Sequence, residues 1–166
     1  MYSFKEKYSE YLSLFEKRLD EFFARLKCKP QVLDDSLKYT LESGGKRIRA
    51  VLTLAVADML GVKTEDVADL ALAIELIHAY SLIHDDLPEM DNDDFRRGRP
   101  SNHKVFGVGN ALLAGDGLLN TAYAVLFEKC KEDKLYVDAA AFICGCAGVH
   151  GMIAGQSADL MCAEKA

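Results

Sequence analysis

The sequence has few of the features that mark a β-rich, nucleic-acid-binding or multidomain protein. Its 166 residues include only three prolines. Leu and Ala dominate the long uninterrupted segments, which favours an all-α fold. The formal net charge of -6 argues against a general nucleic-acid binder, because such proteins need an extended basic surface. A chain of this length is expected to form one domain with a real hydrophobic core.

Cysteine is also sparse, and the five cysteines follow no repeating spacing. An odd number without a frame is not the pattern of a disulfide scaffold. The N-terminal segment MYSFKEKYSEYLSLFEK is charged and helical in pattern, whereas a secretory signal needs an apolar stretch. We therefore expect reduced thiols in a cytoplasmic protein.

Hydrophobic periodicity predicts a series of helices. Residues 2–27 form an amphipathic pattern whose aromatic stripe, from Phe4 to Phe23, we expect to face the core. Further helices are expected over residues 33–42, 50–60, 64–86 and 108–129. Val137 to Gln156 is the most apolar stretch and approaches the length of a membrane span. Because glycines interrupt it, we interpret it as a central buried helix and not as a membrane span.

The most informative stretch is residues 75–103, in which three acidic residues precede a pair of arginines. Asp85, Asp86 and Asp91 supply the carboxylate oxygens that magnesium (Mg²⁺) prefers. Arg96 and Arg97 supply guanidinium groups, whose planar fork can bind two phosphate oxygens at once. The combination predicts a site for a metal-bound diphosphate.

The spacing of these residues sharpens that prediction. Pro88 disfavours helical geometry at Leu87, so Asp85 is expected near the C-terminal end of a long apolar helix. His78 lies two turns earlier on the same face. Asp91 comes alongside Asp85 only if the chain bends at Leu87-Pro88. Carboxylates at a helix C-terminus are unfavourable unless a cation compensates, which favours bound metal.

A second basic segment, GGKRIR at residues 44–49, precedes another predicted helix. Glycines allow a ligand to approach the backbone closely, and helix N-termini attract anions. Lys46 and Arg49 are three residues apart, so both can face one phosphate, whereas Arg47 is expected to face solvent. From these residues alone, an ordinary turn with solvated charges remains an equal alternative.

The motif DDLPEMDNDDFRRGRP resembles the first aspartate-rich motif of the trans-isoprenyl diphosphate synthases. HAYSLIH, GGKRIR and GQSADL are similar to further segments of that family, and the resemblance runs from about residue 41 to 160. It implies an isoprenoid-synthase-like helical bundle that acts on diphosphates with Mg²⁺. The metal ligands it implies are Asp85, Asp91 and Asp86. The substrate-binding residues it implies are Arg96 for the allylic diphosphate, Lys46, Arg49, His78 and Arg97 for isopentenyl diphosphate, and Gln156 in a supporting position.

Within that family the chain is most similar to bacterial farnesyl diphosphate synthases. The resemblance implies condensation of dimethylallyl or geranyl diphosphate with isopentenyl diphosphate. Tyr80 stands five residues before Asp85 and resembles the aromatic floor that stops chain growth at farnesyl diphosphate. Ordinary core packing of Tyr80, and a geranylgeranyl product, remain alternatives.

Members of the family also carry a second motif, DDxxD, which the residues after Asp159 do not supply. We therefore expect residues 1–166 to be the N-terminal part of a single polyprenyl synthase domain, unable to turn over substrate alone. A Mg²⁺-dependent phosphohydrolase and a non-catalytic binding fragment or regulatory subunit are the competing classes. By analogy we expect small diphosphates as ligands and a homodimer, with neither nucleic acid nor a membrane span.

Overall fold

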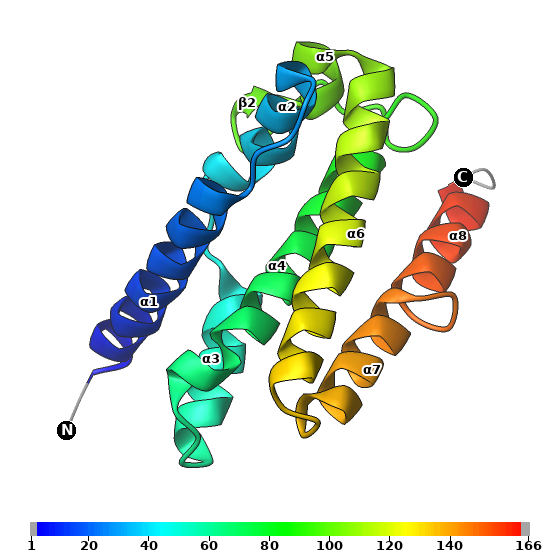
Figure 1. The fold of residues 1–166 in the computed structure, drawn as a ribbon. Helices are drawn as coiled ribbons and strands as arrows, with labels where there is room; N and C mark the ends of the chain where they lie inside the picture. The colour runs from blue at the N-terminus through cyan, green and yellow to red at the C-terminus, as the bar shows by residue number, and fades with distance from the viewer. Residues whose placement is uncertain (1–2, 164–166) are drawn as a thin grey trace.

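A computed structural model describes residues 3–163, which fold into a helical bundle with one small hairpin (Figure 1). This confirms the all-α fold class. The helices are α1 (Phe4–Arg25), α2 (Gln31–Glu42), α3 (Ile48–Met59), α4 (Thr64–Asp85), α5 (Asn102–Phe106), α6 (Val108–Glu132), α7 (Tyr136–Ala147) and α8 (Met152–Ala163). Strands β1 (Phe95–Arg96) and β2 (Arg99–Pro100) pair antiparallel between α4 and α5.

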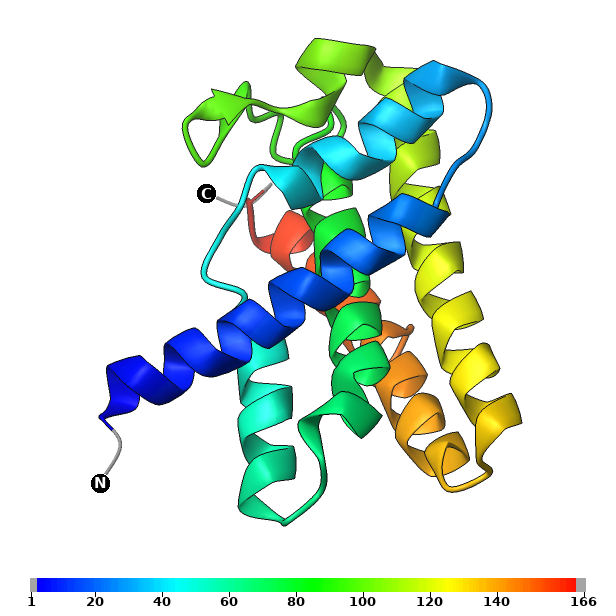
Figure 2. The same ribbon diagram turned by 60° about the vertical axis from the view of Figure 1, so that its left-hand side comes forward.

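Helix α4 lies at the centre of the bundle and carries most of the core. It packs against α6 and α3, and α1 crosses it on another side, as Figure 2 shows. Because neighbours surround it, α4 is apolar on nearly every face and has no single hydrophobic stripe. Leu72, Leu76 and Ile83 are fully buried. Facing them, α6 presents Ala111, Ala114 and other small residues, which let the two helices approach closely.

Helix α1 begins with a capping box, in which Ser3 and Glu6 each accept a hydrogen bond from the other's backbone N–H. The predicted core stripe is confirmed for Tyr11, Phe15, Leu19 and Phe22, which are buried. It is wrong for Phe4, which is 85% exposed. Phe4 is the first residue of α1, and the N-terminal end of this helix projects beyond the bundle in Figure 2. Residue 2, the predicted start of this helix, lies outside the described residues.

The prediction of one central buried helix over residues 137–156 is wrong. The helical chain breaks between α7 and α8, where Gly148 is extended (φ -83°, ψ -163°). Phe142 and Val149 are 73% and 66% exposed, and Ala140 and Ala147 are the buried residues of α7. The physical reason is that α7 packs on α6 and α4 along one side. Half of the residues of α7 are exposed.

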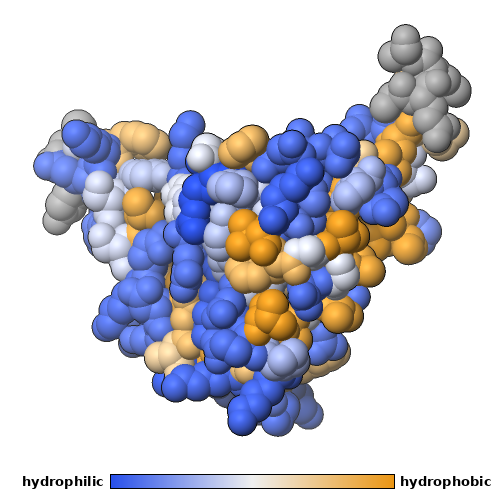
Figure 3. All heavy atoms as spheres, turned by 90° about the horizontal axis from the view of Figure 1, so that it is seen from above, coloured by the Kyte–Doolittle hydropathy of each residue, from blue (hydrophilic) through white to orange (hydrophobic). Residues whose placement is uncertain are grey.

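Two segments are long and apolar enough to cross a membrane by length and composition, namely Thr64–Asp85 and Tyr136–Cys162. The first is the core helix α4, 61% of whose apolar window is buried. The second is the broken α7–α8 pair, with 11% of its window buried. Figure 3 shows hydrophobic side chains gathered on the side of the molecule where α8 runs toward the C-terminus.

Candidate functional site

A groove of the described structure lies along α4, with α7 and α8 on the opposite side. Its volume is about 480 Å³. Apolar side chains line most of its length, and polar groups gather toward the C-terminal end of α4. The lining residues are Arg49, Ile74, Ile77, His78, Ser81, Leu82, Asp85, Phe142, Ile143, Cys146, Ala147, Met152 and Gln156.

Asp85 and Asp91 form the acidic side of this groove. The bend predicted at Leu87-Pro88 is present, and it returns the chain so that the Asp91 N–H donates to the Asp85 carbonyl oxygen at 2.8 Å. Burial, and after it the neighbouring Asp91 carboxylate, raises the pKa of Asp85. The Gln156 side-chain amide donates to Asp85 across the groove. Two like charges therefore meet at a partly buried place, where the Arg96 charge and the Gln156 amide only partly offset them.

Asp86 has a different environment. Its side chain is almost completely buried, and both Nε and Nη2 of Arg96 contact its Oδ1, at 2.7 and 2.5 Å. Arg96 also lies 3.6 Å from Asp93. The charge of Asp86 is therefore matched within the protein, whereas the charges of Asp85 and Asp91 are not.

The donor set at this end fits a magnesium ion bound partly by its substrate. No three His, Cys, Asp or Glu side chains converge into a metal cluster among the described residues. Mg²⁺ does not need such a cluster, because it commonly binds through one or two carboxylates together with substrate phosphates. Asp85 and Asp91 provide that number of carboxylates.

Arg97 occupies the turn of the small hairpin. Arg97 and Gly98 both have positive φ, 52° and 78°, as a type I′ turn between twisted strands requires. This turn aims the guanidinium at the loop before α3, where it donates to the Gly44 carbonyl oxygen. A Cβ at Gly45 would lie 2.5 Å from Nη1 of Arg97, so glycine is needed for this approach.

The segment 44–49 divides its three basic residues between surface and interior. Lys46 and Arg49 are exposed, and Arg49 lines the groove. The prediction that Arg47 faces solvent is wrong, because Arg47 is 6% exposed. Its backbone is left-handed (φ 45°, ψ 37°), which turns the side chain inward to Glu16 of α1 at 2.9 Å.

His78 lies in the groove between the acidic and basic ends. Burial, followed by the positive charges of Arg49 and Arg97, lowers the pKa of His78 to about 4. The imidazole is therefore neutral at pH 7, and its ring nitrogens include one donor and one acceptor.

Tyr80 lies beside a second, smaller hollow of about 190 Å³ that also reaches Asp85. Its side chain is buried, and its ring meets the His84 ring edge-on at 5.7 Å. Tyr80, Met90, Met152 and Ile153 surround this hollow. Tyr80 thus lies one and a half turns from Asp85 and limits the space on that side of α4.

Glu75 is a site residue that sequence reasoning missed. It is 3% exposed and accepts a hydrogen bond from the Ala50 N–H in the first turn of α3, at 3.2 Å. A carboxylate at a helix N-terminus is favourable. A signal was present in the sequence, since Glu75 is a lone acid inside the apolar run LALAIELIHAY.

The family model described as polyprenyl synthetase matches residues 30–166. The chain belongs to the polyprenyl synthetase family. Its match to the farnesyl diphosphate synthase of Geobacillus stearothermophilus is 47% identical over 148 residues, covering 87% of this chain and 50% of that protein. The chloroplastic geranylgeranyl pyrophosphate synthase of Capsicum annuum is 41% identical, with 99% of this chain and 45% of that protein covered.

Solved structures of this family have the same fold. The geranyltransferase of Legionella pneumophila superposes with a TM-score of 0.90 at 38% identity, covering 94% of this chain and 56% of that chain. These similarities confirm the family resemblance and the isoprenoid-synthase fold. The chain spans about half the length of the curated relatives it matches.

Proposed function

We propose that this chain contributes to a prenyltransferase that condenses an allylic diphosphate, dimethylallyl or geranyl, with isopentenyl diphosphate to give farnesyl diphosphate. One observation carries the proposal. A single apolar groove holds Asp85, with Asp91 beside it, and also Arg49 and His78, with Arg97 near them. Such a groove can receive two diphosphates at one end and hydrocarbon along its length.

The basic side is assigned to isopentenyl diphosphate. Lys46 and Arg49 are exposed and project from the N-terminal end of α3, where anions are also favoured by the helix dipole. Arg97 points at the same loop. His78 is neutral and serves as a hydrogen-bonding group next to these charges.

The acidic side is assigned to the allylic diphosphate. When bound there, magnesium would supply positive charge to the diphosphate and so favour its departure as pyrophosphate. Asp85 and Asp91 would hold the ion, and Gln156 would orient Asp85. Asp86 serves this side by holding Arg96 in place, leaving the remaining N–H groups of Arg96 for the departing phosphate.

The rest of the groove suits a hydrocarbon tail and an allylic cation. Ile74, Ile77 and Phe142 are among the apolar side chains that make up most of its lining, beside the Cys146 thiol and the Ser81 hydroxyl. Exclusion of water protects a carbocation from capture. The double bond of isopentenyl diphosphate then attacks the cation, forming the new carbon–carbon bond, and loss of a proton restores neutrality in the product.

Product length is assigned to Tyr80. Tyr80→Ala should enlarge the hollow below Asp85 and shift the product from farnesyl toward geranylgeranyl diphosphate. Ile83→Ala is the matched control, because Ile83 is also a large buried residue of α4 but lines neither hollow. If both variants give the same product as the parent, Tyr80 has only a packing role.

A cytoplasmic location and a homodimer belong to the same proposal. All five cysteines are free thiols, which suits a reducing compartment. Sedimentation of the protein at micromolar concentration tests the homodimer.

The decisive experiment is a condensation assay with geranyl diphosphate, labelled isopentenyl diphosphate and Mg²⁺. It is run on this 166-residue chain and on the complete product of its gene. We expect labelled farnesyl diphosphate from the complete product, and binding without turnover from the 166-residue chain. Phosphate release without chain growth would instead favour a phosphohydrolase.

A further inference from the structure

The loop that carries Lys46 and Arg49 has an unusual backbone. Gly44, Gly45 and Arg47 all have positive φ, at 73°, 141° and 45°. Glycine adopts such angles readily, but an arginine in the left-handed region is strained unless its surroundings hold it there. Arg47 is also the N-cap residue of α3, immediately before its first residue, Ile48.

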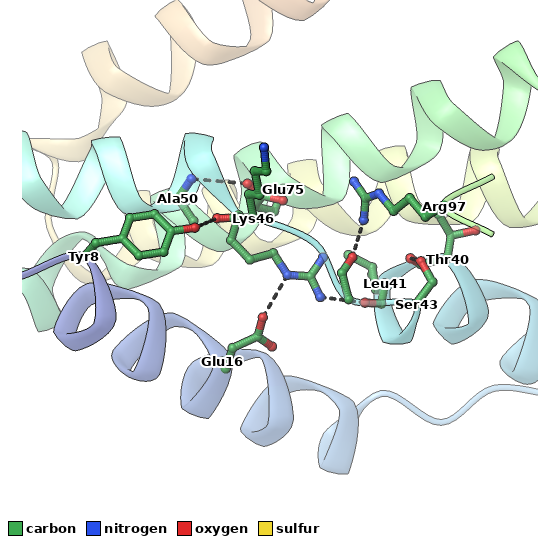
Figure 4. Close-up of polar contacts among 11 residues, drawn as sticks. Tyr8, Glu16, Thr40, Leu41, Ser43, Lys46, Ala50, Glu75 and Arg97 are labelled. Carbon is green, nitrogen blue, oxygen red and sulfur yellow. Dashed lines mark hydrogen bonds and ion pairs between the residues drawn. The ribbon is translucent and has the colours of Figure 1, made fainter. Parts of the chain in front are cut away.

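The side chain of Arg47 is fixed by two other helices. Its Nε donates to Glu16 of α1 at 2.9 Å, and its Nη2 donates to the Leu41 carbonyl oxygen at 2.5 Å (Figure 4). That carbonyl belongs to the last turn of α2, which has unpaired acceptors and the negative end of the helix dipole. The Arg47 side chain is 4% exposed, and its guanidinium carbon lies 6.0 Å from the centre of the Phe15 ring.

The backbone on both sides of Arg47 is also held by hydrogen bonds, at Lys46 and at Ala50. The Tyr8 hydroxyl donates to the Lys46 carbonyl oxygen, and Glu75 accepts from the Ala50 N–H (Figure 4). The Lys46 side chain extends away from Glu16 in this view. Lys46 and Arg49 therefore leave the loop toward solvent, while the arginine between them turns into the protein.

We infer that Arg47 is a positioning residue for isopentenyl diphosphate, a role that rests on the proposed function of the groove. Its buried guanidinium ties α1 to the end of α2 and holds the left-handed turn that directs Lys46 and Arg49 outward. Arg47 does not touch the phosphate itself, because its side chain is buried and its Nε and Nη2 donate to Glu16 and Leu41. Glu16 orients the Arg47 side chain through their ion pair.

Glu16→Gln separates positioning from simple electrostatics. The substitution removes a negative charge near a phosphate site, so long-range electrostatics alone predicts tighter binding of isopentenyl diphosphate. Positioning predicts weaker binding, because the ion pair that orients Arg47 is lost. We expect the dissociation constant for isopentenyl diphosphate, measured by calorimetry on the complete gene product, to rise about tenfold.

The matched control is Glu21→Gln, which removes the same charge from an exposed position on the same helix. We expect Glu21→Gln to bind isopentenyl diphosphate with the same affinity as the parent protein. The kinetic readout is the KM for isopentenyl diphosphate, which should rise in Glu16→Gln while the KM for geranyl diphosphate does not. A general loss of structure would change both, and thermal melting of each variant checks the fold independently.

Two substitutions at Arg47 separate the effect of its backbone conformation from the effect of its side-chain hydrogen bonds. Arg47→Gly accepts the left-handed angles without strain but removes both hydrogen bonds. Arg47→Lys keeps the charge but cannot reproduce the fork of donors. Positioning predicts weaker binding of isopentenyl diphosphate in both, with the KM for geranyl diphosphate unchanged.

The outcomes separate this inference from the function on which it rests. If the parent protein binds neither isopentenyl diphosphate nor inorganic pyrophosphate, the proposed function fails. If the parent binds but Glu16→Gln and Arg47→Gly bind equally well or more tightly, the positioning role is overturned and the proposed function stands.

Discussion

The two sides of the groove differ in how their charges are balanced in the free protein. On the basic side, burial and the neighbouring arginines lower the pKa of Arg97, while Glu75 and the Gly44 carbonyl oxygen partly offset its charge. On the acidic side Asp85 lies near Asp91, and the Gln156 amide is the donor at its carboxylate. Since no ion pair among the described residues involves Asp85 or Asp91, we expect the basic side to be formed before its ligand arrives and the acidic side to need a cation to complete it.

The largest expected effect comes from Asp85→Asn. Condensation by the complete gene product should fall about 10²–10³-fold, the scale seen when one group that stabilises a transition state is removed. Stability without Mg²⁺ should stay the same or rise, because a carboxylate whose pKa is raised in the folded state is unfavourably charged there. Assays of initial rate and urea unfolding measure the two effects.

Asp86→Asn is the contrasting variant, since it leaves Arg96 without its buried partner. Here we expect a loss of about 1–3 kcal/mol in the free energy of unfolding. If Asp85→Asn were as destabilising as Asp86→Asn, the contrast between unmatched and matched carboxylates would be wrong.

The next effect tests the packing of α4, which runs along the groove. Gly115 of α6 lies against His84, and a Cβ there would overlap the imidazole ring, whose Nε2 lies 3.0 Å from the Leu112 carbonyl oxygen. Gly115→Ala should push α4 and α6 apart and lower the free energy of unfolding by about 1–3 kcal/mol.

Gly109→Ala, in the same helix, meets no atom within 4 Å of the new Cβ. Its stability should be unchanged or slightly higher, because alanine favours helix more than glycine does. Equal melting temperatures for the two alanine variants would show that the α4–α6 contact is not close-packed at Gly115.

A smaller effect is expected on the basic side, where the two variants should differ in binding. Gly45→Ala would displace the flexible Arg97 guanidinium, whereas Gly44→Ala has open space around its Cβ. Both introduce a side chain at positive φ, so both should cost about 1 kcal/mol of stability. Calorimetry should show about tenfold weaker binding of isopentenyl diphosphate for Gly45→Ala alone. Equal affinities of the Gly45→Ala and Gly44→Ala variants for isopentenyl diphosphate would show that Arg97 does not take part in binding it.

The smallest expected effect is the uptake of a fraction of a proton when a diphosphate binds. Burial and the nearby arginines lower the pKa of His78 to about 4, and a bound diphosphate would raise it again. Binding near pH 5 should therefore take up a fraction of a proton, measurable by calorimetry in buffers of different ionisation enthalpy. His78→Gln should abolish that uptake, and an uptake that persists would assign the proton elsewhere.

The lowered pKa of His78 also determines the direction in which the free energy of unfolding changes with pH. An unfolded histidine with a pKa of 6.5 binds its proton before the folded one, whose pKa is about 4. Through His78 alone, stability is therefore unaffected above pH 6.5 and falls as the pH drops from 6.5 toward 4.

Sequence patterns correctly predicted the helices that are surrounded by packing partners in this structure, such as α4. Pro88 also predicted the bend that returns Asp91 to Asp85, because a proline restricts the backbone angles of the residue before it, and this effect is local. The α7–α8 segment was mispredicted for the opposite reason. Its composition resembles that of α4, but burial depends on which elements lie opposite, and only one side of α7 has them.

In the site, the charged residue types were predictable but the direction of Arg47 was not. Helical spacing assumes right-handed backbone, and the left-handed angles of Arg47 reverse its side chain. The engagement of Asp86 by Arg96 was equally hidden, because it depends on a hairpin of two-residue strands. Such strands are too short to leave a periodic pattern.

The most direct test of the account is calorimetry of two ligands with and without Mg²⁺ on the complete gene product. Isopentenyl diphosphate should bind in EDTA with nearly the affinity it has in Mg²⁺, because the basic side is already formed. A bisphosphonate directed to the acidic side should bind only when Mg²⁺ is present. Equal bisphosphonate binding in EDTA, or isopentenyl diphosphate binding that requires Mg²⁺, would contradict the division of the groove into a preformed basic side and a cation-dependent acidic side.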